Sequence, residues 1–190
     1  MKLRSAHPSG WALFESEAHR DERGWLAETF RLDALRAHAG DVRIVQQNLG
    51  ASRRGVLRGL HYQLEAPQGK LVQVVQGRLF DAIVDLRRSS ASFGRSFVFE
   101  MRAESLQTLW IPPGFAHGFL ALDDVVVLYA MTAPRVARAE CALRWDSPEL
   151  GIDWPLEGRE PLLSARDRSA PGWDDAPVFE SADPRSPTQR

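Results

Sequence analysis

The stretch that decides the fold runs from residue 71 to residue 86 and reads LVQVVQGRLFDAIVDL. Its two halves, Leu71–Gln76 and Leu79–Leu86, are rich in valine, leucine and isoleucine, and the pair Gly77-Arg78 separates them. Two short apolar runs joined by a glycine-containing pair predict a β-hairpin. We therefore expect antiparallel strands at the centre of the chain.

More strands are expected on the C-terminal side of this stretch. Gly, Pro, Asp or Ser stands in most of the gaps between them, and no helical pattern intervenes. Short strands at this spacing are typical of an antiparallel sandwich or barrel. One helix is predicted at Leu32–Ala39, with Gly40 as its C-terminal cap. The further strands are expected at Ser96–Met101, Thr108–Ile111, Gly118–Leu122, Val125–Thr132 and Cys141–Trp145.

The run LFDAIVDL places two carboxylates on one side of a strand. Alternation puts Leu79, Asp81, Ile83 and Asp85 on one face and Phe80, Ala82, Val84 and Leu86 on the other. Two interpretations stay open. The face with the carboxylates lines a wet cavity, or the strand is half exposed to solvent.

Composition and charge favour an ordinary globular protein. Hydrophobic residues make up 44% of the 190 residues and charged residues 26%. The 24 Lys and Arg residues nearly balance the 25 Asp and Glu residues, so the net charge is -1. With no charge excess, neither nucleic acid nor an anionic membrane is expected as a partner.

The chain is expected to form a single domain at 1–180, followed by a loose tail at 181–190. The tail, SADPRSPTQR, is rich in serine, proline and charge. No apolar run reaches the about 18–20 residues of a membrane span, and the first residues lack the apolar core of a signal peptide. The lone Cys141 cannot form an internal disulfide, so we expect a cytoplasmic protein.

Two histidines stand where a chain lines a pocket. His61 lies in GVLRGLHYQ and His117 in LWIPPGFAHGF, both bordered by glycines and apolar side chains. Imidazole titrates near neutral pH and suits proton transfer. The alternative is a hydrogen-bonded histidine of the core.

The stretch Pro112–His117 matches P-x-G-x-x-H, the second motif of cupin barrels. The first cupin motif needs two histidines one residue apart and then a glutamate. After His61 this chain has Gln63 instead, with Gln68 near the acidic position and Lys70 just beyond. Gln is a weak ligand, and an ammonium repels a divalent cation. The pattern predicts a cupin-like fold without a metal or other cofactor.

Eight blocks of sequence resemble the dTDP-4-dehydrorhamnose 3,5-epimerase family. They lie between Asp21 and Asp167, and one of them is the strand around Tyr129. The other seven blocks are DERGWLAETF, QQNLGASRRGVLRGLHYQ, QGKLVQVVQGRLFDAIVDLR, SFGRS, LWIPPGFAHGF, RWDSPELGIDWP and LLSARD. The resemblance implies a mainly β protein, an antiparallel cupin-like barrel (jelly roll) with a few short helices, assembled as a homodimer.

The same resemblance implies a metal-independent isomerase of deoxysugar and rhamnose biosynthesis. The substrate is a nucleoside-diphosphate 4-keto-6-deoxyglucose, with dTDP as the nucleotide, inverted at C3 and C5. His61 is similar to the family's catalytic base, Asp167 to its dyad partner, Tyr129 to the opposing acid and Lys70 to the residue beside O4. The positions that resemble substrate contacts are Arg23, Glu28, Gln46, Gln47, Asn48, Arg58, His117, Glu140 and Arg166.

These roles agree with the chemistry. A proton α to a ketone is weakly acidic, so its removal needs a base and stabilisation of the enolate. Inversion requires the new proton on the opposite face, which needs a second group. Imidazole and phenol supply the two, and an ammonium near O4 meets the developing charge.

The chain departs from the family after Tyr129. Pro134 and Arg135 stand where the family has paired tyrosines, one of which helps to hold the nucleotide or sugar. An arginine there can stack on a base or meet a phosphate. The departure leaves open a mono-epimerase, or an epimerase of a differently linked nucleotide sugar. Outside that class, the alternatives are a non-catalytic sugar-nucleotide-binding barrel and a metal-dependent cupin.

Overall fold

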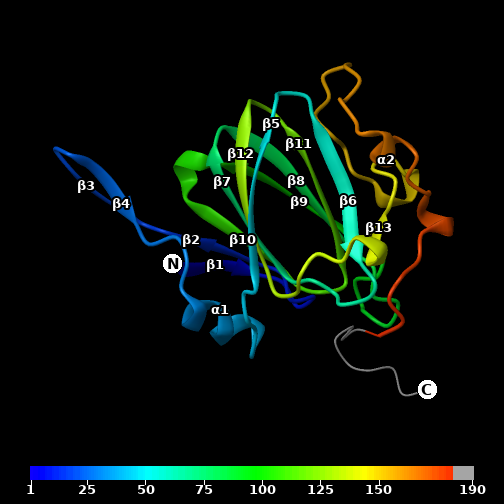
Figure 1. Cartoon of the computed structure of the whole chain (residues 1–190), viewed down its shortest axis with the longest axis horizontal. Helices are drawn as coiled ribbons and strands as arrows, with labels where there is room; N and C mark the ends of the chain where they lie inside the picture. Colours follow the sequence, from blue (N-terminus) through cyan, green and yellow to red (C-terminus); the bar gives the residue numbers. More distant parts are fainter. Residues whose placement is uncertain (182–190) are drawn as a thin grey trace.

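The computed structural model describes residues 1–181, which form two antiparallel sheets packed face to face (Figure 1). The first sheet has the order β1-β2-β10-β7-β12-β5. Its strands are β1 (Lys2–Ala6), β2 (Ala12–Glu15), β10 (Gln107–Ile111), β7 (Lys70–Gln76), β12 (Val125–Met131) and β5 (Gln46–Ser52).

The second sheet has the order β13-β6-β11-β8-β9. Its strands are β13 (Glu140–Ala142), β6 (Leu57–Gln63), β11 (Phe115–Ala121), β8 (Arg78–Asp85) and β9 (Ser96–Arg102). The helices are few and short, as expected: α1 (Leu32–Ala39), α2 (Ala165–Arg168) and 3-10 turns at Ala103–Ser105, Ala137–Ala139, Pro148–Leu150 and Trp173–Asp175. The prediction of a mainly antiparallel β fold is confirmed.

The predicted hairpin over Gly77-Arg78 is wrong, although both strands exist. β7 belongs to the first sheet and β8 to the second, and they do not pair. Gly77 has a φ of 75°, and a Cβ on it would lie 2.4 Å from the carbonyl oxygen of Asp124. The glycine therefore turns the chain from one sheet into the other, where a side chain would not fit.

Strand β8 is buried on both faces, so the half-exposed interpretation of this strand is wrong. Leu79 and Ile83 pack between the two sheets, and Ala82 and Val84 pack on the other side. Asp81 and Asp85 are both fully buried. Asp85 is neutralised by Arg87, whereas Asp81 is hydrogen-bonded to His117, which lines the cavity described below.

The C-terminal part of the described chain covers the outer face of the second sheet. Leu143, Trp154 and Phe179 join the core cluster on that face. The hydroxyl of Tyr62 on β6 donates to the carbonyl oxygen of Pro177 at 2.6 Å. This segment carries α2, so the covering layer also fixes the residues of α2 against β6.

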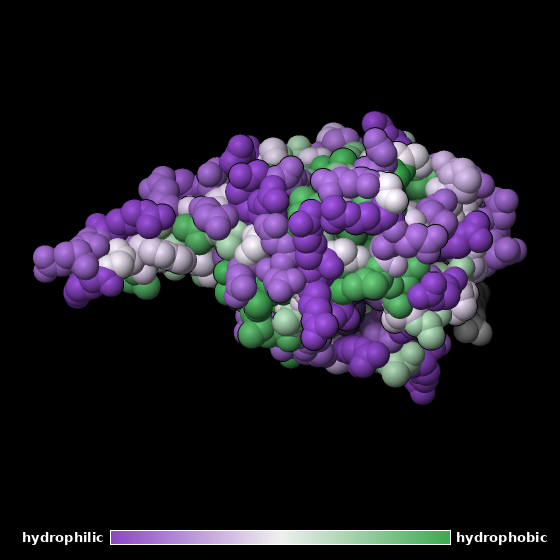
Figure 2. Space-filling model, turned by 90° about the horizontal axis from the view of Figure 1, so that it is seen from above, coloured by the Kyte–Doolittle hydropathy of each residue, from purple (hydrophilic) through white to green (hydrophobic). Residues whose placement is uncertain are grey.

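The N-terminal part contributes the predicted helix and a projecting arm. α1 has the predicted bounds, and Gly40 caps it by donating to the carbonyl oxygen of Arg36. The arm is the two-stranded ribbon of β3 (Ala18–Asp21) and β4 (Gly24–Ala27), which extends away from the sheets (Figure 1). From above it stands clear of the body (Figure 2).

Two further expectations concern the ends and the environment of the chain. The expected loose tail at 181–190 lies, from residue 182 onward, outside the described residues. Among residues 1–181, no helix has the length and apolar character needed to cross a membrane.

Candidate active site

A cavity of about 420 Å³ lies between the two sheets and opens at their edge. Residues of both sheets line it, because β5, β7 and β12 supply one wall and β6, β11 and β13 the other. Eight of the thirteen predicted site residues line this cavity: Asn48, Arg58, His61, Lys70, His117, Tyr129, Glu140 and Arg166.

His61 reaches the cavity from β6 and is held by Asp167 from α2. The Nε2 atom of His61 lies 2.5 Å from Oδ1 of Asp167, which is 3% exposed. Ser164 caps α2 and donates its hydroxyl to the other carboxylate oxygen at 2.7 Å. Burial raises the pKa of Asp167, but hydrogen bonds from His61 and Ser164 outweigh it and hold the pKa below its ordinary value. The carboxylate therefore accepts from Nε2–H, which leaves the lone pair of a neutral imidazole on Nδ1.

A pair of glycines brings β6 and β11 together beside this histidine. His61 and His117 are cross-strand partners, and the register shifts between His117 and Phe119. A Cβ on Gly59 would lie 2.5 Å from the Cα of Gly118. Only glycine permits this approach, which places both histidines on the cavity wall.

Lys70 begins β7 in the opposite sheet. Its Nζ atom donates to the carbonyl oxygen of His61 at 3.2 Å, so the ammonium bridges the cavity. Burial lowers the pKa of Lys70 to about 8, although the charges of Asp81 and Glu140 oppose this. The side chain is mainly protonated at neutral pH and can donate to a developing negative charge.

Tyr129 projects from β12, beside Asn48 on β5 and Val72 on β7. Burial, with a contribution from the charge of Asp81, raises the pKa of the Tyr129 phenol above its ordinary value. The phenol is therefore a proton donor at neutral pH. Its sheet is not the sheet of His61, so the imidazole and the phenol come from opposite walls.

His117 has a carboxylate partner that the sequence interpretation did not place in the site. Its Nε2 atom donates to Oδ2 of Asp81 at 2.9 Å, and both side chains are buried. The other oxygen, Asp81 Oδ1, is buried without a hydrogen-bond partner among the described residues. The alternation of β8 was the available signal, because it set Asp81 on a face with Leu79 and Ile83.

The rim of the cavity carries a carboxylate between two arginines. Glu140 accepts from Arg135 at 2.5 and 3.0 Å and from Arg166 at 2.6 Å. The hydrogen bond from Arg135 is the main cause that lowers the pKa of Glu140 to about 2, aided by Arg166 and opposed by burial. Arg135 lines the cavity but was not among the predicted site residues.

Four other predicted site residues do not line the cavity of their own chain. Gln46 lies just outside it, where it donates to Asn48 and accepts from the amide of Arg135. Gln47 follows on the opposite face of β5. Arg23 lies at the tip of the arm, paired with Asp21, and Glu28 accepts from the N-terminal amine at 3.2 Å.

The two histidines of the cavity do not share a group of metal-ligating side chains. Each imidazole is bound to its own carboxylate, and Lys70 lies beside His61. Across residues 1–181, no three His, Cys, Asp or Glu side chains come together in a metal-binding arrangement. Chemistry without a metal stays a prediction.

Comparison with known proteins identifies the family. The family model described as dTDP-4-dehydrorhamnose 3,5-epimerase matches residues 7–175. The chain belongs to this family. The dTDP-4-dehydrorhamnose 3,5-epimerase of Methanothermobacter thermautotrophicus is 43% identical over 172 residues, which cover 90% of this chain and 93% of that relative.

Two solved structures extend the comparison. An epimerase of Legionella pneumophila, in complex with dTDP-4-keto-L-rhamnose, is 37% identical with a TM-score of 0.84, over 89% of this chain and 90% of that one. A 3'-monoepimerase of Streptomyces bikiniensis, in complex with dTDP-quinovose, is also 37% identical, with a TM-score of 0.80 over 86% and 83%.

Membership of the epimerase family confirms several expectations at once. The predicted family, the cupin-like β fold, the isomerase class and the place in dTDP-sugar biosynthesis are all confirmed. The comparisons do not assign roles to individual residues. The geometry of the cavity supports the roles proposed below.

Proposed function

We propose that this epimerase inverts both C3 and C5 of a dTDP-linked 4-keto-6-deoxyglucose in the cavity between the sheets. One observation carries the proposal. A histidine held by a buried carboxylate and a tyrosine kept protonated line the same cavity from opposite sheets. Inversion needs this arrangement, because one proton leaves from one face of the ring and another arrives on the opposite face.

Proton removal falls to His61 in this proposal. A neutral imidazole takes the proton from the carbon beside the ketone, and the bonding electrons move into an enolate whose charge rests on O4. Asp167 stabilises the imidazolium that forms. The ammonium of Lys70 donates to O4, and one donor placed in this way contributes about 3–4 kcal/mol to transition-state stabilisation.

Reprotonation falls to Tyr129. The phenol gives its proton to the opposite face of the same carbon, the enolate collapses to the ketone, and the inverted centre results. The phenolate then regains a proton from water and His61 releases its proton to water, so the cycle balances. A second cycle at the other carbon completes the double inversion.

The remaining cavity residues hold the rest of the substrate. We assign Asn48, Arg58, His117, Glu140 and Arg166 to substrate contacts, together with Gln46 at the edge. Arginine forks suit the diphosphate. Gln47 points to the other face of β5, so its predicted role as a contact has the least support from the geometry.

We propose that the enzyme is a homodimer in which the arm completes the partner's site. The arm carries Arg23, and its Trp25 and Leu26 are 57% and 75% exposed, while Leu49 on β5 is 66% exposed. Apolar side chains on a projecting ribbon favour a second copy as the cover. This arrangement gives Arg23 and Glu28 a role that their own cavity does not.

A complementation experiment tests the arm. Arg23→Ala and His61→Asn chains are each expected to have little activity, and mixed dimers regain activity, because one of their two sites has both intact residues. Light scattering should give twice the chain mass of 21.3 kDa. A monomer, or no recovery in mixed dimers, would refute the assembly without touching the roles of His61 and Tyr129.

Deuterium exchange tests the reaction. After incubation with dTDP-4-keto-6-deoxyglucose in deuterated water, NMR should show deuterium at C3 and C5 with inversion at both. Exchange at one carbon alone would identify a mono-epimerase, which is the activity named for the similar Streptomyces bikiniensis enzyme. No exchange would favour a non-catalytic barrel.

The lone Cys141 fits action in the cytoplasm, which is part of the proposal.

A further inference from the structure

The loop after β12 forms one rim of the cavity and is held by glutamine side chains. Its backbone amides and carbonyls, which would otherwise be left to solvent, bond to residues of neighbouring elements. The bonds join Arg135 N to Gln46 Oε1 at 2.9 Å, Val136 N to Gln63 Oε1 at 2.7 Å and Gln68 Nε2 to Ala133 O at 3.0 Å. Arg135 therefore extends from a fixed backbone.

The guanidinium of Arg135 is fixed as well. Glu140 accepts from its Nε atom at 2.5 Å and from its Nη2 atom at 3.0 Å. These two bonds lie in the plane of the guanidinium, so they lock its orientation and leave both of its faces free of hydrogen bonds. The side chain remains 57% exposed while lining the cavity, so the plane is accessible to a ligand.

The same ion pair disfavours a phosphate as the ligand of Arg135. The edge with Nε and Nη2, one of the two edges with which a guanidinium forks an anion, is already occupied by Glu140. A phosphate at that edge would have to displace a carboxylate that also binds Arg166. A flat ring laid on the guanidinium face would displace nothing.

We propose that Arg135 binds the nucleobase of the sugar nucleotide by stacking its guanidinium on the ring. The inference rests on the proposed function, because it presumes a nucleotide sugar in this cavity. A guanidinium stacks on any planar base through its π-face, and such contacts do not read the hydrogen-bonding edge. Arg135 thus selects for a planar ring, while Arg166 and Arg58 remain for the diphosphate.

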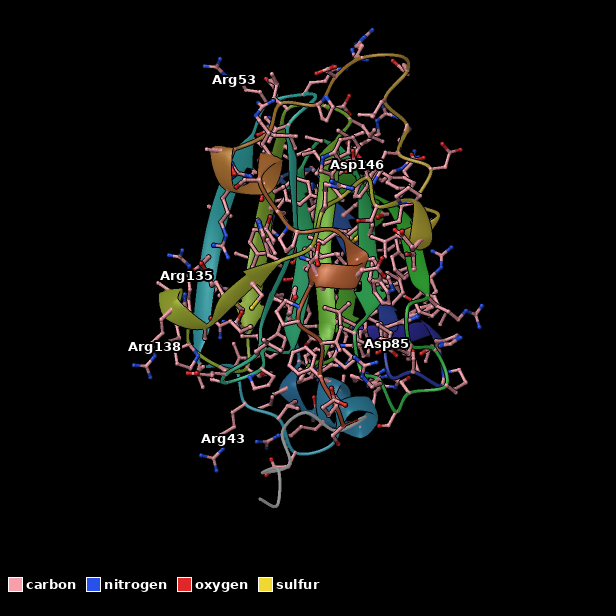
Figure 3. The ribbon with its side chains drawn as sticks, turned by 90° about the vertical axis from the view of Figure 1, so that its right-hand side faces the viewer. Arg43, Arg53, Asp85, Arg135, Arg138 and Asp146 are labelled. Atoms are coloured by element: carbon pink, nitrogen blue, oxygen red, sulfur yellow. The ribbon has the colours of Figure 1, made fainter. Side chains whose placement is uncertain are left out.

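Substitutions at Arg135 separate the contribution of its planar side-chain group from the contribution of its positive charge. Arg135→Lys keeps the charge and removes the plane, Arg135→Tyr keeps a plane and removes the charge, and Arg135→Gln removes both. The matched control is Arg138→Gln, since Arg138 projects from the same connection (Figure 3), is 84% exposed and does not line the cavity. Melting temperatures check that each variant is folded.

Calorimetry with two probes, dTDP and inorganic pyrophosphate, decides the matter. We expect dTDP to bind about 10-fold more weakly to Arg135→Lys and Arg135→Gln. Arg135→Tyr should stay within about 3-fold of the wild-type protein, and Arg138→Gln should not change. Pyrophosphate should bind equally to all of them, because stacking does not involve it.

Different results overturn the inference in different ways. Wild-type affinity for dTDP in Arg135→Lys together with a loss in Arg135→Tyr, or a parallel loss of pyrophosphate affinity, would make Arg135 a phosphate contact. Unchanged dTDP affinity in all three variants would refute the stack while leaving the proposed function intact. A wild-type protein that binds pyrophosphate but gains nothing from the base of dTDP would refute both.

Discussion

His61 and His117 face each other on β6 and β11, yet each gives its Nε2–H to a different carboxylate. The bond from His61 goes to Asp167 at 2.5 Å, and the bond from His117 goes to Asp81 at 2.9 Å. The His61 side chain is 36% exposed and that of His117 only 6%. Two histidines in adjacent positions therefore have separate tasks, and His61 is the one with access to a substrate carbon.

Replacing His61 removes the proposed base. We expect His61→Asn to lower deuterium incorporation at the ring carbons by about 10²- to 10⁴-fold, the usual contribution of a general base. The affinity for dTDP should hold within a few-fold, because the nucleotide contacts are elsewhere. NMR in deuterated water and calorimetry measure the two quantities.

The matched control for His61 is its cross-strand partner. His117→Asn should weaken substrate binding and leave exchange measurable at high substrate concentration. If His117→Asn abolished exchange while His61→Asn retained it, the assignment of the base would be reversed.

Asp167 tests whether the imidazole needs its carboxylate. Asp167→Asn replaces an acceptor with a group that can donate, so the neutral imidazole can adopt the wrong tautomer and the imidazolium loses its partner. We expect kcat to fall by about 10²- to 10⁴-fold with little change in KM. A variant with wild-type kcat would show that the 2.5 Å contact has no part in catalysis.

The pH profile should report the ammonium of Lys70. Its pKa of about 8 means that the protonated donor prevails below pH 8 and is lost above it. The value of kcat/KM, which reports the free enzyme, is therefore expected to decline above about pH 8, where the charge on O4 loses its donor. A profile that stays flat to pH 10 would contradict the role of Lys70 at O4.

Asp81 provides the check on the origin of that alkaline decline. The charges of Asp81 and Glu140 raise the pKa of Lys70, whereas burial lowers it. The other titratable side chains that line the cavity beside Lys70 include Tyr129 and His117. Asp81→Asn removes one negative charge, so the alkaline decline should move to lower pH. A shift to higher pH, or none, would refute this coupling.

Glu140 should make stability depend on pH in acid. Its folded pKa of about 2 lies below the unfolded value of about 4.3. Its contribution to the free energy of unfolding is therefore complete above pH 4.3 and is lost as the pH falls toward 2. Urea unfolding should show wild type more stable than Glu140→Gln at pH 6, with a smaller difference at pH 3. If the difference in the free energy of unfolding between the two proteins grew as the pH fell, the predicted dependence would be wrong.

The fold was predictable where the pattern was local. The bounds of α1 and the positions of β9, β10 and β12 follow from apolar runs and their turns. The assignment of β7 and β8 to separate sheets did not follow, because the Gly77-Arg78 pair looks the same in a hairpin and in a crossing between sheets. What distinguishes them is the approach of Asp124 to Gly77, a contact between distant residues.

The site was predictable where its residues belong to recognisable motifs. His61, Lys70, Tyr129 and Asp167 meet as the resemblance implied. The partnership of His117 with Asp81 and the arginine pair around Glu140 depend on register and loop path, which the sequence does not reveal. The position of Arg23 in the turn between β3 and β4 also needed the structure.

His61 and Tyr129 serve opposite faces of one sugar ring in the proposed mechanism, and Tyr129→Phe tests this most directly. With dTDP-4-keto-6-deoxyglucose in deuterated water, we predict that NMR will show deuterium at C3 or C5 with the original configuration retained, since His61 still removes and returns a proton on its own face. Inversion at the wild-type rate, or complete loss of exchange, would contradict the account.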